Sequence, residues 1–344
     1  MSAVSHGTAE PLTPAALEID CEQVTGEIVD ALRRIVSREL RRQGAVVALS
    51  GGIDSSVTAA LCVRAFGPTR SLALLMPEAD SDERTLSLSR AVAGALGMEA
   101  VHEDITPILQ AAGCYTKRDD AVRELIPELG EGWRWKIALP SVVGSDSYRL
   151  FTLVAQAPDG RTVEVRLPAK NYLAVVAATN FKQRVRKMIE YYHADRLNYA
   201  VAGTPNRLEY DQGFFVKGGD GAADVKPIAH LYKTQVYRLA EYLELPEAVL
   251  RLQPTTDTYS LAQSQEEFYF SLPLEKLDLC LYAHNHGLPA ESVAGAVGLS
   301  VEDVGRIFRD IEQKRRATRY LHLPALLVEP VTEVPVTEQL SADS

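Results

Sequence analysis

A short apolar run that ends in a pair of glycines limits the possible folds of this chain more than any other feature. Residues 45–49 read Ala-Val-Val-Ala-Leu, a continuous apolar run typical of a parallel strand that is buried on both faces. Ser50-Gly-Gly-Ile-Asp-Ser-Ser56 follows, and a helical pattern runs from about Asp54 to Phe66. Such a strand–turn–helix gathers the first N–H groups of the helix at one point, where the helix dipole favours an anion.

The side chains of this loop indicate what kind of anion it binds. Ser50, Ser55 and Ser56 add hydroxyl donors, whereas Asp54 brings a negative charge. A carboxylate beside a phosphate is favourable only when a cation bridges the two, and ligation by oxygen alone suits Mg²⁺. The segment contains no lysine, so it is not a Walker A loop.

The stretch after this loop alternates between strand and helix patterns. A second buried strand is predicted over Ser71–Met76, a helix over Ser81–Leu96 and a third strand over Ala100–Ile105. An earlier helix is predicted over Ala15–Gln43. Strands that alternate with helices predict right-handed βαβ units on a parallel sheet, and therefore an α/β fold.

Residues 113–168 interrupt this alternation and are predicted to form an insert. Two alternating runs, Tyr148–Gln156 and Thr162–Leu167, flank Ala-Pro-Asp-Gly, which predicts a β-hairpin. The α/β pattern then resumes with a long helix over 170–196, a strand over 198–202 and a helix over 233–243. A helical C-terminal part follows. We expect one domain over 15–328, with disordered ends at 1–14 and 329–344.

Charge and cysteine content exclude several classes of function. The chain has 344 residues and a formal net charge of −10, which argues against general binding of nucleic acid. The four cysteines are far apart and form no CxxC pair, so no familiar zinc or redox motif is present. No secretory h-region or apolar run long enough to span a membrane is seen, and we expect a cytoplasmic protein.

The loop residues 50–56 also carry a family resemblance. Ser-Gly-Gly-Ile-Asp-Ser-Ser resembles the pyrophosphate-binding loop of the ATP-pyrophosphatase superfamily, whose members cleave ATP between the α- and β-phosphates. The resemblance implies the doubly wound parallel sheet of the adenine-nucleotide-hydrolase type. It does not by itself choose among the members of the superfamily.

A second constellation narrows the choice. Residues 203–224 read Gly-Thr-Pro-Asn-Arg-Leu-Glu-Tyr-Asp-Gln-Gly-Phe-Phe-Val-Lys-Gly-Gly-Asp-Gly-Ala-Ala-Asp, and Lys233 follows. These residues resemble the NAD⁺ synthetase elements GT-x-N-x-x-E, G-[FY]-F-x-K and GDG-x-AD. The resemblance runs from about Ala45 to Arg316, with the hairpin insert left out.

The resemblance implies a role for each matching residue. ATP contacts are implied for Ser50, Gly51, Gly52, Ile53, Asp54, Ser55, Ser56, Thr204, Lys233 and Thr255. Magnesium ligands are implied at Asp54 and Glu209. Contacts to the deamido-NAD substrate are implied for Arg184, Lys217 and Asp224, and for Gln313 and Lys314, a pair whose first member is often His in the family.

The chemistry expected of such an enzyme agrees with these residue types. Pyrophosphate that leaves during formation of an adenylated carboxylate carries negative charge, which Lys233 and Mg²⁺ would stabilise. Asp54 and Glu209 supply two carboxylate ligands, so these three residues are the predicted catalytic set. Amide synthesis of this kind requires no protein nucleophile, because most of the catalysis comes from positioning.

The sequence therefore predicts an ATP- and Mg²⁺-dependent amide ligase that converts deamido-NAD to NAD⁺. No glutaminase domain precedes residue 45, so ammonia is the expected nitrogen donor unless a separate glutaminase supplies it. The resemblance also implies a homodimer. Neither a nucleic acid nor a membrane is expected as a partner.

Two alternatives stay open at this stage. The first is the same chemistry on a different carboxylate, with the 113–168 insert reshaping the pocket. The second is a non-catalytic nucleotide-binding regulator, whose helical pair over 290–316 would contact DNA or protein. The two carboxylates Asp54 and Glu209 count against the regulator, since binding of nucleotide alone does not require both.

Overall fold

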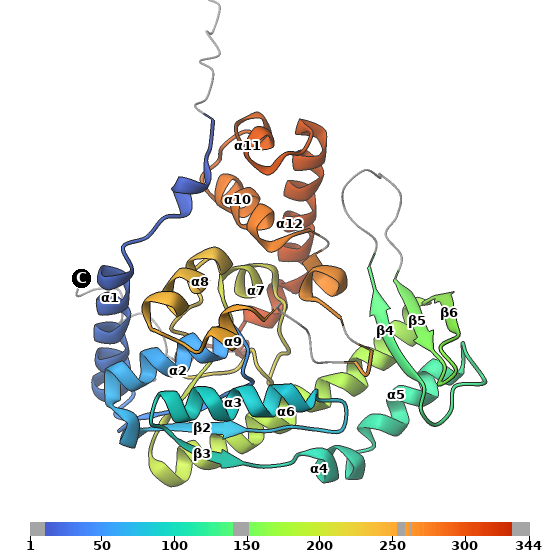
Figure 1. The fold of residues 1–344 in the computed structure, drawn as a ribbon, viewed down its shortest axis with the longest axis horizontal. Coiled ribbons are helices and arrows are strands. Elements are labelled where there is room, and N and C mark those ends of the chain that lie inside the picture. Colours follow the sequence, from blue (N-terminus) through green and yellow to red (C-terminus); the bar gives the residue numbers. More distant parts are fainter. Residues whose placement is uncertain (1–10, 140–150, 253–258, 262, 271, 332–344) are drawn as a thin grey trace, which may run out of the picture.

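The centre of the molecule is a four-stranded parallel sheet in the order β3-β2-β1-β7 (Figure 1). The computed structural model describes residues 11–139, 151–252, 259–261, 263–270 and 272–331. The strands are β1 (Ala45–Ala48), β2 (Ser71–Leu75), β3 (Glu99–His102) and β7 (Ala200–Ala202). Ala45 pairs with Ser71 on one side and with Ala200 on the other. Strand β1 is central and is covered on both faces, which suits its small and β-branched residues.

Helices cover the two faces of this sheet. Val47 and Ala73 point into a core that is shared with α1 (Cys21–Arg33), α2 (Ile53–Phe66), α3 (Glu83–Ala95) and α8 (Lys233–Tyr242). Val46 and Leu74 point the other way, toward α4 (Thr106–Ala111) and the long helix α6 (Ala169–Leu197). The predicted doubly wound α/β sheet is confirmed.

The N-terminal segment differs from the single helix that was predicted over Ala15–Gln43. A 3₁₀ turn covers Pro14–Leu17, α1 begins only at Cys21, and a π-helical stretch follows over Arg34–Glu39. The boundary lies at Asp20, whose side chain accepts a hydrogen bond from the N–H of Gln23 at 3.0 Å. An N-cap of this kind fixes a helix start that the apolar spacing alone does not mark.

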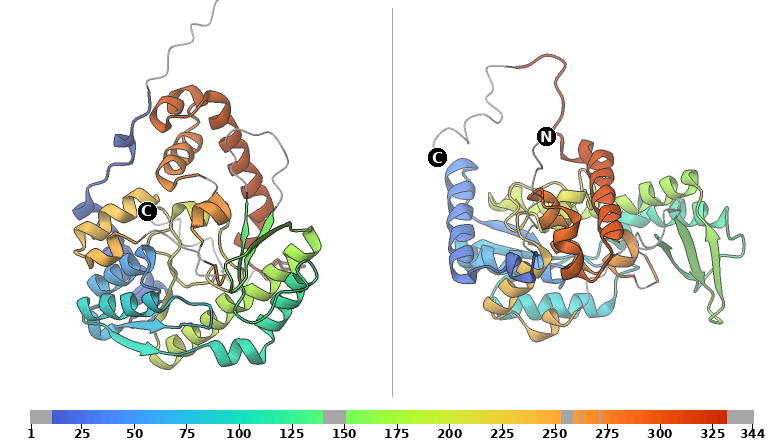
Figure 2. Two further views of the ribbon diagram at one scale, coloured as in Figure 1. Left: turned by 45° about the vertical axis from the view of Figure 1, so that its right-hand side comes forward. Right: turned by 90° about the horizontal axis from the view of Figure 1, so that it is seen from above.

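The predicted hairpin is present and is part of a three-stranded antiparallel sheet. Its strands are β4 (Arg134–Ala138), β5 (Thr152–Gln156) and β6 (Thr162–Arg166), in that order. The N–H of Gly160 donates to the carbonyl of Ala157 at 2.9 Å, as the predicted turn requires. Strand β4 was not predicted. The sheet packs against α5 (Cys114–Arg123) and the first turns of α6, and it projects to one side of the molecule (Figure 2).

The C-terminal part is helical, as predicted. Helices α10 (Leu274–Asn285), α11 (Ala290–Val297) and α12 (Val301–His322) enclose a core of their own, and two short helices, α7 (Arg207–Gln212) and α9 (Glu247–Leu250), precede them. In Figure 1 and in the left-hand view of Figure 2, α10, α11 and α12 rise from one side of the α/β core. Among the described residues, no helix is both long and apolar enough to cross a membrane. Most of the ends predicted to be disordered, residues 1–10 and 332–344, lie outside the described residues.

Candidate active site

The loop between β1 and α2 is held in shape by its own serines. Gly51 has a φ of +75°, which a glycine adopts without strain. The hydroxyls of Ser55 and Ser56 both donate to the carbonyl of Gly52, at 3.0 and 2.8 Å, and that of Ser50 lies 3.1 Å from that of Ser55. The N–H groups of Ser50 and Gly52 donate to the hydroxyls of Ser55 and Ser50, both at 3.3 Å, so the serines hold the turn of the loop together.

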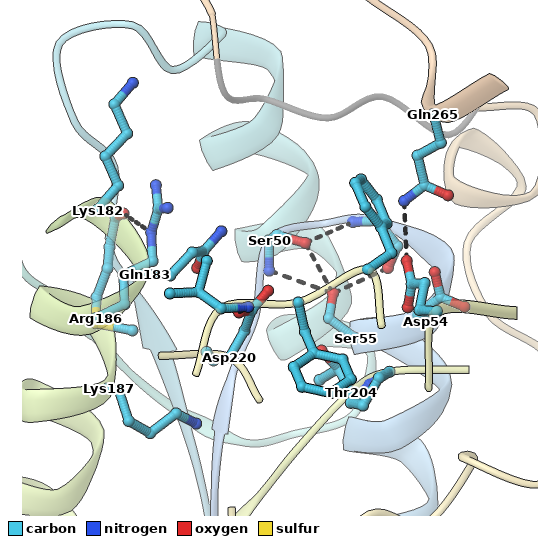
Figure 3. Close-up of a pocket in the computed structure, with 18 of the residues that line it drawn as sticks. Ser50, Asp54, Ser55, Lys182, Gln183, Arg186, Lys187, Thr204, Asp220 and Gln265 are labelled. Atoms are coloured by element: carbon cyan, nitrogen blue, oxygen red, sulfur yellow. Dashed lines mark hydrogen bonds between the residues drawn. The ribbon is translucent and has the colours of Figure 1, made fainter. Parts of the chain in front are cut away.

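This loop opens into a cavity of about 550 Å³ at the carboxyl end of the parallel strands. Ser50 and Ser55 lie between Gln183, Arg186 and Lys187 of α6 on one side and Asp54 and Gln265 on the other (Figure 3). Most of the site residues predicted from the sequence line this cavity: Ser50, Gly52, Ile53, Asp54, Ser55, Arg184, Thr204, Glu209, Lys217 and Lys233. Gly51 and Ser56 belong to the same loop, and Thr255 lies outside the described residues.

A buried lysine connects the charged residues of the cavity. Lys233 is the first residue of α8 and is 2% exposed, and its ammonium forms an ion pair with the carboxylate of Asp54. Glu209 of α7 lies beside them. One cation is therefore placed near two carboxylates that come from different parts of the chain.

Burial and mutual charge alter the pKa values in this group. For Glu209, burial and the neighbouring charge of Asp54 raise the pKa well above the usual range of a glutamic acid, although Lys233 acts in the opposite direction. For Lys233, burial lowers the pKa, but the carboxylates of Asp54 and Glu209 outweigh this effect and the pKa is raised. The cluster is therefore short of positive charge, and a further cation would be favourable there.

Asn206 ties the two carboxylates together. It forms the N-cap of α7 in a capping box, in which its side chain accepts from the N–H groups of Leu208 and Glu209. The backbone N–H of Asn206 donates to Oε2 of Glu209 at 3.1 Å, and its Nδ2 donates to Oδ1 of Asp54, also at 3.1 Å. The Asn-x-x-Glu spacing is a capping-box signal that the sequence analysis did not use.

The donor set suits magnesium bound together with a phosphate ligand. The described residues contain no group of three or more His, Cys, Asp or Glu side chains that would hold a metal by themselves. Mg²⁺ usually takes only one or two carboxylates and completes its shell with water and substrate phosphates. Asp54 and Glu209, joined through Asn206 beside the phosphate-type loop, fit that pattern.

A buried aspartate sets the start of α8. Asp278 of α10 is fully buried and accepts hydrogen bonds from the N–H groups of Lys233, at 3.2 Å, and Thr234, at 2.8 Å. It thereby satisfies two of the unpaired donors at the N-terminus of this helix. Because Lys233 is the first residue of α8, the same contact fixes the point from which its side chain reaches Asp54.

Two residues predicted to contact the substrate lie at the rim of the cavity and contact the protein itself. The ammonium of Lys217 donates to the carbonyls of Tyr320 and Leu323, at 2.7 and 2.8 Å, and so caps the C-terminus of α12. Arg184 donates from Nε to the carbonyl of Lys217 at 3.3 Å. Both side chains are exposed, and both line the cavity.

Three other predicted substrate residues do not line the cavity. Asp224 accepts hydrogen bonds from the N–H of Val201, at 2.8 Å, and the hydroxyl of Tyr191, at 3.2 Å. Lys314 pairs with Asp310 at 2.9 Å. Gln313 points to solvent from α12. The part of α12 that does reach the cavity lies further along, at Thr318, Tyr320 and Leu321.

The cavity also has lining residues that the sequence analysis did not select. At one end they are charged and include Arg186, Lys187, Glu190 and Asp220, with Lys187 and Glu190 paired at 2.7 Å. At the other end they are aromatic, at Tyr172, Tyr259, Phe268 and Tyr269. The Arg-Val-Arg-Lys run of α6 and the Gly-Asp-Gly turn signalled the charged end. No sequence pattern signalled the aromatic end, which is assembled from distant segments.

A family model and several curated proteins match this chain over most of its length. The model described as NAD synthase matches residues 24–126 and 161–320. The NH(3)-dependent NAD(+) synthetase of Rhizobium meliloti (strain 1021) is 58% identical over 318 residues, which cover 92% of this chain and 95% of the relative. The protein of the same name from Thermotoga maritima is 34% identical over 279 residues, 81% of this chain and 92% of that one.

Two solved structures have a similar fold. The NH3-dependent NAD synthetase of Campylobacter jejuni subsp. jejuni has a TM-score of 0.59 at 22% identity, over 90% of this chain and 100% of that one. The NMN synthetase of Francisella tularensis has a TM-score of 0.57 at 21% identity, over 90% and 99%. At these identities the likeness concerns the fold.

A pair of glycine variants tests the shape of the loop. A Cβ at Gly51 would lie 2.8 Å from Cβ of Leu88, and the conformation of the loop would hold the alanine at a positive φ. We therefore expect Gly51→Ala to lower the free energy of unfolding by about 1–3 kcal/mol. Gly52 has an ordinary φ of −74°, and its nearest obstacle is the Ser50 hydroxyl at 3.3 Å. Gly52→Ala should lower the free energy of unfolding by less than about 1 kcal/mol. Equal losses in urea unfolding would contradict this account of the loop.

Proposed function

The chain belongs to the NAD synthase family, and on that premise we propose that it converts deamido-NAD and ammonia to NAD⁺, with cleavage of ATP to AMP and pyrophosphate. The observation that carries the proposal is the buried Lys233 with the half-buried carboxylates of Asp54 and Glu209, beside the strand–glycine–helix loop. This is the charge arrangement that the expected reaction requires, since pyrophosphate must depart from the α-phosphate of ATP.

The nucleotide would bind with its phosphates on residues 50–56. The loop offers N–H groups and the N-terminus of α2, and Lys233 lines the same cavity. Magnesium bound by Asp54 and Glu209 would neutralise phosphate charge and polarise the reacting phosphate. Thr204 lines the same part of the cavity and is proposed to contact ATP, as is Thr255, which lies outside the described residues.

The reaction has two steps. An oxygen of the nicotinate carboxylate attacks the α-phosphorus of ATP, and the bond to the bridging oxygen of pyrophosphate breaks. Ammonia then attacks the acyl carbon, AMP leaves with the former carboxylate oxygen, and one proton is released. Lys233 stabilises the charge that develops on the departing pyrophosphate, and the cavity walls hold the carboxylate in line with the α-phosphorus.

The cations on α6 and the loop of Lys217 favour a dinucleotide as the acid. Arg184, Arg186, Lys187 and Lys217 all line the cavity, and a dinucleotide brings a pyrophosphate for them to bind. Lys187 is already paired with Glu190, whereas Arg184, Arg186 and Lys217 donate to backbone carbonyls. A small free acid would bring less negative charge to these three cations than a dinucleotide does. Asp224, Gln313 and Lys314 do not line this cavity, so the substrate contacts proposed for them would have to be made outside it.

The two alternatives fit less well. A regulator that contacts DNA through α11 and α12 needs free cations there. Arg315 instead forms a two-pronged pair with Asp211, at 2.6 and 2.8 Å, and Lys314 pairs with Asp310, so this basic face of α12 is reduced to the exposed Arg316 and Arg319. Another carboxylate remains the nearer competitor, since a protein of similar fold is named NMN synthetase. The acid form of nicotinamide mononucleotide is therefore the competitor to test.

The direct test incubates the purified protein with ATP, Mg²⁺ and deamido-NAD, with either ammonium or glutamine as the nitrogen source. We expect NAD⁺, AMP and pyrophosphate in equal amounts with ammonium, and almost none with glutamine. A strong preference for nicotinic acid mononucleotide over deamido-NAD would overturn the named substrate. Activity with glutamine only when a second protein is added would instead indicate a separate glutaminase. ADP and phosphate as products would overturn the mechanism.

Replacing the metal-binding carboxylate tests the site itself. Asp54→Asn keeps the size of the side chain but removes the charge that Lys233 and magnesium share. We expect kcat/KM to fall by about a hundredfold or more. Asp30→Asn, at a carboxylate on the surface of α1, is the control and should leave the rate unchanged. Near-normal turnover of Asp54→Asn would show that this carboxylate is not a metal ligand.

We also propose that the protein is a homodimer that packs through α6, while a cytoplasmic location stays a prediction from the sequence. Leu173, Met188 and Tyr192 lie on the outward face of α6 and are 63%, 56% and 63% exposed. Arg184 lies among them, so a partner on this face would border the cavity. Large apolar side chains exposed on one face of a long helix are typical of an interface between subunits.

Light scattering tests the dimer. Wild-type protein should have twice the chain mass of 37.7 kDa, and Met188→Asp with Tyr192→Asp should shift it to the monomer, because two carboxylates would be buried without partners. Leu326→Asp, at a residue that is 78% exposed and lies after α12, is the control and should leave the dimer intact. A monomer mass for the wild-type protein would contradict the proposal.

A further inference from the structure

Between its two matched parts, the NAD synthase model leaves residues 127–160 unmatched. These residues form the middle of the stretch 113–168 predicted as an insert, and from here on the word insert means residues 127–160. Its strand β4 is an edge strand of the small sheet, because it pairs only with β5. An edge strand has unpaired N–H and C=O groups along its free side. In this molecule the described residues of the segment 259–267, namely 259–261 and 263–267, occupy that side, although they lie more than a hundred residues further along the chain.

Backbone contacts attach both ends of the segment 259–267 to β4. At the first end, the N–H of Leu261 donates to the carbonyl of Trp135 at 3.2 Å, and the N–H of Trp135 donates to the Ser260 hydroxyl at 3.1 Å. At the second end, the N–H of Leu139 donates to the carbonyl of Glu267 at 3.3 Å. The segment thus runs along the strand and is held at two places.

Side chains reinforce the same attachment. The ammonium of Lys136 pairs with the carboxylate of Glu267 at 2.6 Å, and the amide of Gln263 donates to the carbonyl of Ile137. The ring of Tyr259 packs on that of Trp135, with centroids 5.1 Å apart. The insert therefore determines where the segment lies.

Gln265 lies between these attachment points and reaches the charged cluster. It is 9% exposed, and its Nε2 donates to Oε1 of Glu209 at 3.0 Å (Figure 3). A glutamine amide has a donating end and an accepting end, and here the donating end faces Glu209. With Asn206 on Oε2 and Gln265 on Oε1, both oxygens of Glu209 are held in place.

The other end of this amide has no partner. Oε1 of Gln265 is buried and accepts no hydrogen bond from any described residue, and Gln265 lines the cavity. A buried acceptor without a donor is unfavourable unless a bound group supplies one. A water molecule coordinated to magnesium would supply a strong donor of the required kind, if Glu209 holds the metal.

We propose that Gln265 is a positioning residue for the magnesium site, and that the insert is the support that holds it there. Its Nε2 orients Glu209 as a metal ligand, while its Oε1 accepts a hydrogen bond from metal-bound water. The inference rests on the proposed function, because that function places magnesium at Glu209. It adds a role for the part of the chain that the family model does not cover.

Manganese binding, followed by electron paramagnetic resonance in the presence of a non-hydrolysable ATP analogue, measures this role without turnover. We expect Gln265→Leu to weaken Mn²⁺ binding about tenfold, in line with other residues that orient metal ligands. In the ligase assay, the Mg²⁺ concentration for half-maximal rate should rise by a similar factor, with the KM for deamido-NAD within about twofold. Mn²⁺ binding equal to that of the wild type would overturn the proposal.

Two cations on β4 provide a test variant and a matched control for the supporting role of the insert. Lys136→Met removes the contact to Glu267, whereas Arg134→Met removes a contact to Gln156 of β5, at 2.8 Å. We expect Lys136→Met to weaken Mn²⁺ binding about threefold and Arg134→Met to have no effect. The effect of Lys136→Met should vanish in the Gln265→Leu background, because it acts through Gln265.

The outcomes separate this inference from the proposed function. Equal effects of Lys136→Met and Arg134→Met, or effects that add to Gln265→Leu, would overturn the supporting role of the insert. If the wild-type protein makes no NAD⁺, the proposed function fails, and the Mn²⁺ titration still decides whether Gln265 serves the metal site. A normal wild-type ligase with an unaffected Gln265→Leu variant would overturn the inference alone.

Discussion

The rest of the structure depends on the burial of one lysine beside two carboxylates. Lys233 is almost completely buried, and an isolated ammonium there would be strongly unfavourable without Asp54 and Glu209 nearby. The three residues belong to the loop after β1, to α7 and to the start of α8, so the cluster forms only when the parallel sheet and its helices are in place. The fold and the chemistry therefore have the same requirement: one site where a phosphate loop, a cation and two metal-binding carboxylates meet.

Each layer of the molecule contributes a contact to this cluster. Asn206 links Asp54 to Glu209 from within the α/β core, and Asp278 of the C-terminal helices holds the first residue of α8. Gln265, which is supported by the insert, provides a third contact, to Oε1 of Glu209. Because these contacts come from separate segments, a change far from the cavity in sequence can still alter the position of a reacting group. This gives a physical reason for the insert to matter although it lies outside the residues that the NAD synthase model matches.

The sequence predicted those parts of the site that depend on local pattern. The apolar run before Ser50, the glycine loop and the following helix were predicted within a residue or two, because short-range hydrophobic and glycine signals determine them. The sequence did not predict β4, Asn206, Asp278 or Gln265. Asn206 and Asp278 act through helix caps, Gln265 contacts a residue 56 positions away, and β4 pairs with a strand 14 to 22 positions away. Lys217 was predicted as a substrate contact, but no local pattern could show that its ammonium closes the end of α12. The roles of Asp224, Gln313 and Lys314 followed from motif spacing alone, and spacing does not determine which side of a helix or loop faces a cavity.

The account requires that the carboxylate of the acid attack the α-phosphorus of ATP while the cluster holds the departing pyrophosphate. Deamido-NAD labelled with ¹⁸O in its nicotinate carboxylate tests this directly. After complete conversion with ATP and ammonium, mass spectrometry of the AMP should show one ¹⁸O atom per molecule, and the NAD⁺ should retain the other. AMP without ¹⁸O would contradict the account, because no bond between the carboxylate oxygen and the α-phosphorus would then have formed.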